Sequence, residues 1–393
     1  MVGSLYIHVP FCPRKCVYCD FVSVPFDRAL SERYLGALLK EIALRADQSA
    51  GRPAGTATCE KGIKVKTLFI GGGTPTVLGD GQLKGLLDFL GTNLDFYPDA
   101  EVTVEANPAT LDGKKAGILL RGGVGRLSIG AQSFDEEELK ILGRVHRPAD
   151  AAEAVLASRA AGFDNIGLDL MYGIPGQTRE TWGRTLEAAL ELGPRHISAY
   201  ELTVEEKTGL WGLVKKGAIE LPPEDEVLAM SGVAEERLGA AGFMRYEVSN
   251  YALPGFECRH NLNYWRRGRY LGFGAAAHSF SGARRWRNTP GVHDYIASVE
   301  AGRFPVREAE TLTKDDEERE LVLLGLRTAE GIPLSGPGGD DFSFRMERAS
   351  RQLVREGLLE IRRDRLRATR RGFQLLDSVI SGLLDGVPSR RAF

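Results

Sequence analysis

Residues 5–19 read LYIHVPFCPRKCVYC and join a short apolar run to three closely spaced cysteines. The run at 5–9 is typical of a buried strand, and Pro10 and Pro13 place the cysteines on the loop that follows it. Three thiolates suit zinc or an iron–sulfur cluster. A structural zinc site usually has four ligands, whereas three ligands on a cubane cluster leave one iron open. We therefore take three residues as candidate ligands of a [4Fe–4S] cluster, with zinc as the alternative: Cys12, Cys16 and Cys19.

The composition is that of a soluble globular protein of 393 residues, with 43% apolar and 26% charged side chains. This length favours one large domain and a smaller one. The net charge of −2 indicates no general attraction to nucleic acid or to anionic membranes. We find neither an apolar run long enough for a membrane helix nor a signal peptide. Five cysteines, three of them clustered, indicate metal binding in a reducing compartment, so we expect a cytoplasmic protein.

Short β-rich runs alternate with amphipathic segments over the first half of the chain. The runs predict strands at 5–9, 65–70, 101–105, 126–130, 165–171 and 196–201. The segments predict helices at 31–46, 81–90, 110–120, 150–161 and 179–192, the first of them with Ser31 as its N-cap. Strands that alternate with helices pair in parallel through right-handed crossovers. We therefore predict an α/β fold, as an open sheet or a partial (β/α)6 barrel.

Four residues lie at or just beyond the ends of successive predicted strands: Gly72, Glu105, Gln132 and Asp169. In (β/α) barrels this end carries the functional site, because its loops converge there. A glycine after a strand lets a ligand approach the backbone closely. We therefore expect these four residues to border one site.

The pattern changes after residue 200. We predict a helix at 224–241 and a strand near 245–250. Further helices at 315–329 and 345–356, with a hairpin at 358–361 and 366–368, predict a smaller, mostly helical, winged-helix-like domain. We accordingly divide the chain into a barrel at 1–220, a barrel extension at 221–305 and a C-terminal domain at 306–393. Residues 345–371 hold ten arginines against four acids, but these are interleaved and no nucleic-acid-binding motif is present, so we expect a solvated face and no nucleic-acid partner.

Six motifs carry a resemblance to a known family: YIHVPFC with the C-x3-C-x2-C spacing at 6–19, GGGTPT at 71–76, EANP at 105–108, GAQSF at 130–134, DLMYGIPGQT at 169–178 and HNLNYW at 260–265. Over most of residues 4–280 the chain resembles the radical S-adenosylmethionine (SAM) superfamily. Within it, the chain is similar to the group of oxygen-independent coproporphyrinogen III oxidases and HemW heme chaperones. The resemblance implies a partial (β/α)6 radical-SAM barrel whose [4Fe–4S] cluster binds SAM.

The same resemblance implies two sets of SAM contacts. The SAM bound to the cluster would be contacted by Tyr6, Gly72 and Glu105. Relatives of the oxidase type accommodate a second SAM, whose contacts would be Tyr18, Gly73, Thr74, Gln132, Arg144, Asp169 and Thr203. A carboxylate suits the ribose hydroxyls of SAM, and an arginine suits its carboxylate. The alternatives are structural, namely barrel packing for Tyr6 and a surface charge for Arg144.

Two features favour the chaperones over the oxidases. The oxidases have a further cysteine two residues after the third, where this chain has Phe21, and an N-terminal extension that this sequence does not show. The segment at 260–265 resembles the heme-binding motif of the chaperones. His260 would then contact the iron, and Tyr264 and Trp265 would stack on the macrocycle, whereas the alternative is that all three are structural.

The implied function is a heme chaperone that hands heme to respiratory apo-proteins, and the alternative is the oxidative decarboxylase of coproporphyrinogen III. The implied cofactors are the [4Fe–4S] cluster, one or two SAM molecules and heme. The implied partners are an electron donor to the cluster and a second copy of the chain, with no membrane span. His278 is a second candidate ligand for the heme iron.

Overall fold

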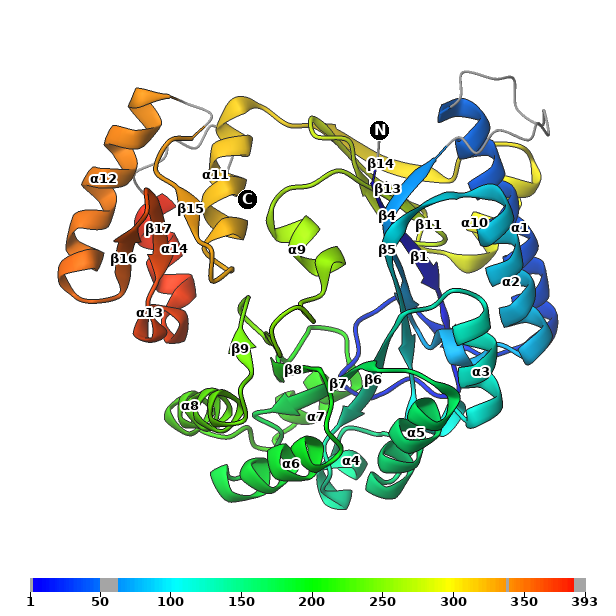
Figure 1. Ribbon diagram of the computed structural model, residues 1–393. Coiled ribbons are helices and arrows are strands. Elements are labelled where there is room, and N and C mark those ends of the chain that lie inside the picture. The colour runs from blue at the N-terminus through cyan, green and yellow to red at the C-terminus, as the bar shows by residue number, and fades with distance from the viewer. Residues whose placement is uncertain (1–2, 50–62, 337–338, 385–393) are drawn as a thin grey trace.

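The computed structural model describes residues 3–49, 63–336 and 339–384, so Cys59 lies outside the described residues. Within these residues one large sheet has the strand order β14-β13-β12-β11-β1-β4-β5-β6-β7-β8-β10-β9 (Figure 1). Its centre is parallel and comprises β11 (Tyr270–Phe273), β1 (Ser4–Val9), β4 (Lys64–Gly72), β5 (Asp95–Ala106), β6 (Arg126–Gln132), β7 (Asn165–Tyr172) and β8 (His196–Glu201). All six predicted strands and their parallel pairing are confirmed.

The sheet becomes antiparallel at both ends. The end strands are β12 (His278–Phe280), β13 (Arg284–Asn288), β14 (Val306–Thr311), β10 (Asn250–Ala252) and β9 (Met244–Arg245). The single strand that we predicted near 245–250 is wrong. The chain turns back there because the N–H of Tyr246 donates to the carbonyl of Asn250 (3.1 Å), which separates β9 from β10.

A layer of helices covers the outer face of the sheet (Figure 1). These are α1 (Arg28–Ser49), α2 (Asp80–Asn93), α3 (Gly113–Arg121), α5 (Pro148–Ala161), α6 (Arg179–Glu191), α8 (Glu224–Ala240) and α10 (Val292–Glu300). Leu5 and Ile7 of β1 are fully buried in the same core as Leu38 of α1. Successive side chains of a strand point to opposite faces, so Tyr6 and His8 point to the inner face. No described helix combines the length and apolar character needed to cross a membrane.

The N-cap of α1 differs from the prediction. The helix begins one turn before Ser31, and the carboxylate of Asp27 accepts a hydrogen bond from the N–H of Leu30 (2.7 Å). Ser31 is buried within the helix, where its hydroxyl accepts a hydrogen bond from Gln82 of α2 (2.9 Å). Both residues are good N-caps by type, and the packing of α1 against α2 decides between them.

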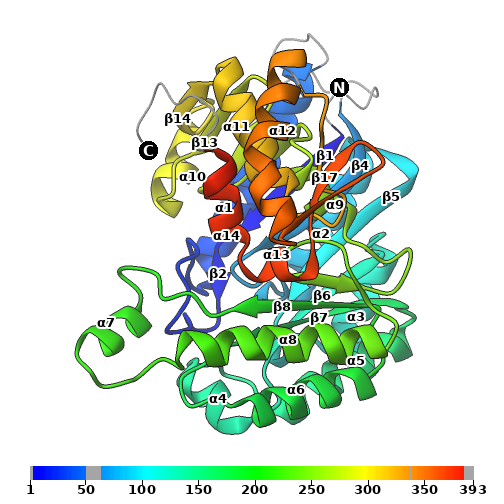
Figure 2. The ribbon, with the colours of Figure 1, turned by 90° about the vertical axis from the view of Figure 1, so that its left-hand side faces the viewer.

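The C-terminal part has a core of its own, which includes Val322, Ile332, Phe342 and Leu366. Its elements are α11 (Lys314–Gly325), β15 (Ile332–Pro333), α12 (Asp340–Arg355), β16 (Leu359–Arg362), β17 (Arg365–Ala368), α13 (Arg370–Gln374) and α14 (Leu376–Leu384) (Figure 2). The hairpin of β16 and β17 is confirmed, and it follows the helix α12. Because β14 pairs with β13, the large sheet continues into residues 306–393.

Candidate functional site

The three clustered cysteines lie between β1 and α1. Cys12 is the last residue of the short strand β2 (Phe11–Cys12), which pairs in parallel with β3 (Val24–Pro25). The start of this segment is held to the glycine-rich turn after β4. The N–H of Gly73 donates to the carbonyl of Val9 (2.9 Å), and the N–H of Thr74 donates to that of Phe11 (2.7 Å). The N–H of Phe26 also donates to the carbonyl of Cys12 (2.9 Å), so these backbone bonds together define the position of Cys12.

The middle of the cysteine loop is held by backbone bonds to segments that follow β6 and β8. The N–H of Val17 donates to the carbonyl of Leu142 (3.2 Å), and the carbonyl of Val17 accepts from the N–H of Leu210 (2.7 Å). Leu210 is the second residue of α7 (Gly209–Lys215), and Leu142 directly follows α4 (Glu136–Ile141). Val17 and Tyr18 also pack against an apolar cluster around Leu142 and Met171. The loop therefore closes across the end of the sheet.

Polar side chains face two of the sulfurs. The hydroxyl of Thr74 lies 3.6 Å from Sγ of Cys12, and Nη1 of Arg144 lies 3.5 Å from Sγ of Cys16. Burial raises the pKa of Cys19 to about 11 and also raises that of Cys12. Such thiols need a metal centre nearby to become thiolates at neutral pH, because a bound metal deprotonates them.

The described residues contain no group of three His, Cys, Asp or Glu side chains arranged around a point where a single metal ion would bind. The three cysteines nevertheless interact electrostatically with one another, so their sulfurs are close. A cubane cluster spreads its thiolate ligands over separate iron atoms. The donor set of three cysteines on one loop therefore fits a [4Fe–4S] cluster better than a zinc ion.

The glycine-rich turn after β4 contacts Glu105 at the end of β5. The N–H of Gly72 donates to the carboxylate of Glu105 (3.0 Å). Gly72 has φ +107°, and a Cβ there would lie 2.5 Å from the ring of His8, so only glycine fits. Burial, followed by the charge of Asp169, raises the pKa of Glu105 to about 7. A partly buried carboxyl and an open backbone turn thus lie side by side at the strand ends.

Asp169 on β7 is held by serine hydroxyls from both neighbouring strands. Ser128 of β6 donates to its two oxygens (3.1 and 3.0 Å), and Ser198 of β8 donates to Oδ1 (2.7 Å). Burial raises the pKa of Asp169, while the serines, Arg126 and Arg144 lower it. We did not foresee Ser128 and Ser198, because only the strand register shows that they face Asp169.

Gln132 and Arg144 converge on the end of β6. Gln132 has φ +67°, which is rare for a residue other than glycine and is typical of functional sites. Nη2 of Arg144 donates to the carbonyl of Gly130 (2.7 Å), and Arg144 also bonds Tyr18. Arg144 is therefore directed at the cysteine loop and is not the surface charge of the alternative interpretation. Its Nε is buried without a hydrogen-bond partner in the described part of the chain, which is consistent with a place for an anionic group.

The remaining two predicted SAM contacts differ in their surroundings. The hydroxyl of Tyr6 lies 3.0 Å from Nδ1 of His8, and Nε2 of His8 lies 2.8 Å from the carbonyl of Val22 in the cysteine loop. Tyr6 thus borders both β4 and the loop. Thr203 follows β8 and is exposed. The contacts of Tyr6 support its assignment as a SAM contact, whereas for Thr203 only the position at a strand end supports the assignment.

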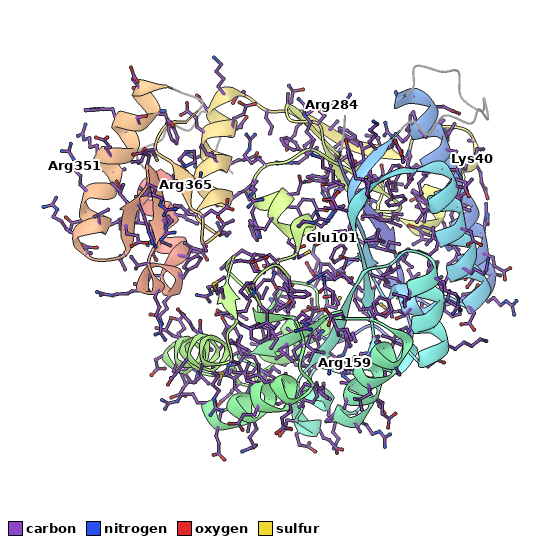
Figure 3. The ribbon with its side chains drawn as sticks, viewed as in Figure 1. Lys40, Glu101, Arg159, Arg284, Arg351 and Arg365 are labelled. Atoms are coloured by element: carbon purple, nitrogen blue, oxygen red, sulfur yellow. The ribbon has the colours of Figure 1, made fainter. Side chains whose placement is uncertain are left out.

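The segment at 260–265 forms α9 (Arg259–Trp265), whose first N–H groups bond a carboxylate of the sheet. The N–H groups of Arg259 and His260 donate to Glu101 of β5 (3.0 and 2.9 Å), which lies beside α9 in Figure 3. His260 is only 1% exposed, and its ring nitrogens bond the hydroxyls of Thr67 and Tyr264, both at 2.9 Å. Both nitrogens that could bind iron are thus engaged within the protein.

The other two aromatic residues of α9 point in different directions. Trp265 hydrogen bonds the buried carboxyl of Glu247. Tyr264 instead borders a cavity of about 720 Å³ between the inner face of the sheet and α11. The cavity wall also includes Tyr6, Phe21 and His278. Hence Tyr264 and His278 share one cavity, while Trp265 is not among its lining residues.

Comparison with known proteins gives a consistent result. The sequence pattern of the Radical SAM superfamily matches residues 6–189, and that of the HemN C-terminal domain matches residues 312–375. The chain is 39% identical over 384 residues to the heme chaperone HemW of Mycobacterium tuberculosis, covering 97% of this chain and 94% of that protein. It is 41% identical over 299 residues to HemW of Escherichia coli, covering 74% of each. In structure it is similar to coproporphyrinogen III oxidase (HemN) of Escherichia coli, a radical SAM enzyme, with a TM-score of 0.81 and 25% identity over 97% of this chain and 90% of that one.

Proposed function

Because this chain belongs to the family of the HemW heme chaperones, within the radical SAM superfamily, we propose that it binds heme and delivers it to respiratory apo-proteins. The observation that carries this proposal is the extent of the match. HemW of Bacillus subtilis is 39% identical over 84% of this chain, and the Mycobacterium tuberculosis protein matches 97% of it. A match of this extent includes the C-terminal domain as well as the barrel.

The resident cofactors of the family, a [4Fe–4S] cluster and SAM, fit the site at the strand ends. When bound together they supply the reductive cleavage of SAM that is typical of the superfamily. Cys12, Cys16 and Cys19 would hold the cluster, and the turn at Gly72 would receive the methionine end of SAM. Glu105 would face the cationic groups of SAM, because its carboxylate already lies at that turn.

A second SAM is part of the proposal. Its contacts would be Tyr18, Gly73, Thr74, Gln132, Arg144, Asp169 and Thr203. The strongest support comes from Asp169, whose oxygens are held by two serines and would accept from ribose hydroxyls. Arg144 would offer a carboxylate its buried Nε–H, which has no hydrogen-bond partner among the described residues.

The alternative function is oxidative decarboxylation of coproporphyrinogen III, which the similarity to HemN favours. Against it, the position of the oxidase's further cysteine is taken by Phe21, whose side chain is 61% exposed and borders the cavity. An exposed phenylalanine supplies no thiolate there, but it provides a flat apolar surface for a macrocycle. We therefore rank the chaperone first.

The setting of this function is also a proposal. We place the protein in the cytoplasm, where a reducing environment keeps the cysteines available for the cluster. An electron donor to the cluster and a second copy of the chain are the further partners that we propose.

Anaerobic reconstitution with iron and sulfide, followed by two parallel assays, tests the function. We expect hemin to bind with a stable Soret band and coproporphyrinogen III to remain unconverted when SAM and a reductant are present. Decarboxylation at enzyme-like rates would establish the oxidase instead, and absence of hemin binding would exclude the chaperone.

A further inference from the structure

The cavity between the sheet and α11 combines apolar and cationic walls. Aromatic and aliphatic side chains line it from Phe21 and Tyr264 to Leu323 and Leu324 of α11. Its volume of about 720 Å³ lies in the range of cavities that hold drug-sized ligands and cofactors, about 300–1,000 Å³. Figure 1 shows α11 on the side of the C-terminal domain that faces α9 and the sheet. A ligand in this cavity would contact both the large sheet and α11 of the C-terminal domain.

Three arginines place positive charge on the cavity wall, which favours a ligand with acidic groups. Arg267, Arg285 and Arg287 line it. Glu320 of α11 bonds the first two at 2.9 and 2.6 Å, and Glu308 of β14 bonds Arg287 at 2.6 Å. Among the described residues, Nη2 of Arg267 and Nε of Arg287 are nevertheless buried without a hydrogen-bond partner. Unpaired buried donors of this kind are costly, and a ligand with carboxylates would satisfy them.

A histidine stands on the same wall. His278 of β12 lies opposite Arg287 of β13 in the strand register, is exposed, and borders the cavity. Its ring hydrogen bonds the backbone of Ala276, and such a bond fixes the orientation of a metal-binding imidazole.

We propose that this cavity is the heme site, with His278 as the iron ligand and Arg267 and Arg287 as partners of the heme propionates. The inference rests on the proposed function, because it assumes that the chain binds heme, and it adds the place and the ligand. The iron ligand is then His278 and not His260, because both ring nitrogens of His260 already form hydrogen bonds within the protein. Heme would lie with one edge beside Phe21 of the cysteine loop and the other against α11.

The geometry also couples heme to the C-terminal domain. Glu320 of α11 pairs with both Arg267 and Arg285, and Arg267 is one of the two proposed propionate partners. A propionate bound to Arg267 would take the place of the Glu320 carboxylate at that arginine. The exchange breaks the Arg267–Glu320 ion pair, which is one of the two ion pairs that Glu320 makes, so heme binding would loosen the C-terminal domain.

A titration of the reconstituted full-length chain with hemin, followed through the Soret band, tests the iron ligand. We expect His278→Ala to shift or lose the Soret band and to weaken hemin binding by about 10- to 100-fold. Metal-free protoporphyrin should bind equally well to this variant and to the unaltered protein. The matched control is His293→Ala, because His293 is exposed on α10 and does not line the cavity.

The propionate partners are tested with protoporphyrin and its dimethyl ester. Arg287→Gln should weaken binding of the free acid by about tenfold and leave the ester unaffected. Arg284→Gln is the control, because Arg284 is on the same strand but outside the cavity lining (Figure 3). Glu320→Gln should tighten hemin binding several-fold relative to Glu317→Gln on the same helix.

The outcomes distinguish a wrong heme site from a wrong function. If the unaltered chain does not bind hemin, the proposed function fails and this site with it. If it binds hemin, and His278→Ala and Arg287→Gln bind with the same affinity and spectrum, the site is wrong while the chaperone function stands. Unchanged affinity in Glu320→Gln would overturn the carboxylate exchange.

Discussion

The hydroxyl of Thr67 on β4 lies 2.9 Å from Nδ1 of His260, which is 193 residues further along the chain. The ring also stacks on Phe69, with 5.3 Å between centroids, and its Nε2 bonds the hydroxyl of Tyr264. Burial lowers the pKa of His260 to about 3, so the ring stays neutral. His260 therefore fastens α9 to the inner face of the sheet.

This relationship predicts a structural cost for changes at His260. His260→Ala removes two side-chain hydrogen bonds and leaves a buried gap, so we expect the free energy of unfolding of the heme-free protein to fall by about 2–4 kcal/mol. Thr67→Val removes one of these bonds with little change of shape and should cost about 1 kcal/mol. Urea unfolding measures both. Unaltered stability in His260→Ala, combined with loss of the Soret band, would instead support iron ligation by His260.

The cysteine assignment predicts which thiols the cluster needs. Cys12→Ser, Cys16→Ser and Cys19→Ser should each lose the broad absorbance and most of the iron after anaerobic reconstitution. Cys258→Ser should keep both, because Cys258 is buried next to Glu101, with 3.6 Å between Sγ and Oε1, at the start of α9. Cys59→Ser should keep both as well. Loss of iron in either of these two variants would show that our ligand set is incomplete.

The contact between Glu105 and Gly72 predicts how SAM binding depends on charge. Glu105→Gln keeps an acceptor for the N–H of Gly72 but removes the negative charge, so SAM should bind about tenfold more weakly. A larger residue at Gly72 is a poorer test, because its Cβ would collide with His8. The measurement is the SAM-induced change in the EPR signal of the reduced cluster. The variant's signal without SAM serves as the control for cluster assembly.

The same carboxyl predicts a pH dependence. Since the pKa of Glu105 is about 7, acidification below that value neutralises it. The SAM affinity of the unaltered protein should therefore fall between pH 8 and pH 6, while Glu105→Gln shows a flat profile over that range. Parallel profiles for the two proteins would show that Glu105 does not contact SAM.

Glu247 predicts a pH-dependent stability of the opposite kind. Burial raises its pKa from 4.5 to about 7 in the folded protein. Between these values the folded state holds a proton that the unfolded state has lost, so stability falls as the pH rises from about 4.5 to 7. Glu247→Gln should therefore be more stable than the unaltered protein by about 1–3 kcal/mol at pH 8, and this gain should shrink at pH 5. Glu236→Gln, on the exposed side of α8, should show no such difference.

The sequence alone determined those features that depend on residues close together in the chain. The alternation of apolar runs with amphipathic segments predicted the six strands and their parallel order, because periodicity follows directly from strand and helix geometry. Prolines beside the cysteines predicted the loop in the same way. The ends of strands could also be placed, so Gly72, Glu105, Gln132 and Asp169 were expected at one edge of the sheet.

Only the tertiary structure decided which distant residues meet. The serines that hold Asp169 depend on the register of three strands, and the N-cap of α1 depends on packing against α2. The sequence left both a ligand role and a structural role open for His260, and only the structure shows that Thr67 and Tyr264 bond its two ring nitrogens. Residues of α11, β12 and β13 line the cavity together, and Glu320 of α11 bonds Arg267 and Arg285 there. Such contacts join positions tens to hundreds of residues apart, and no local pattern in the sequence records them.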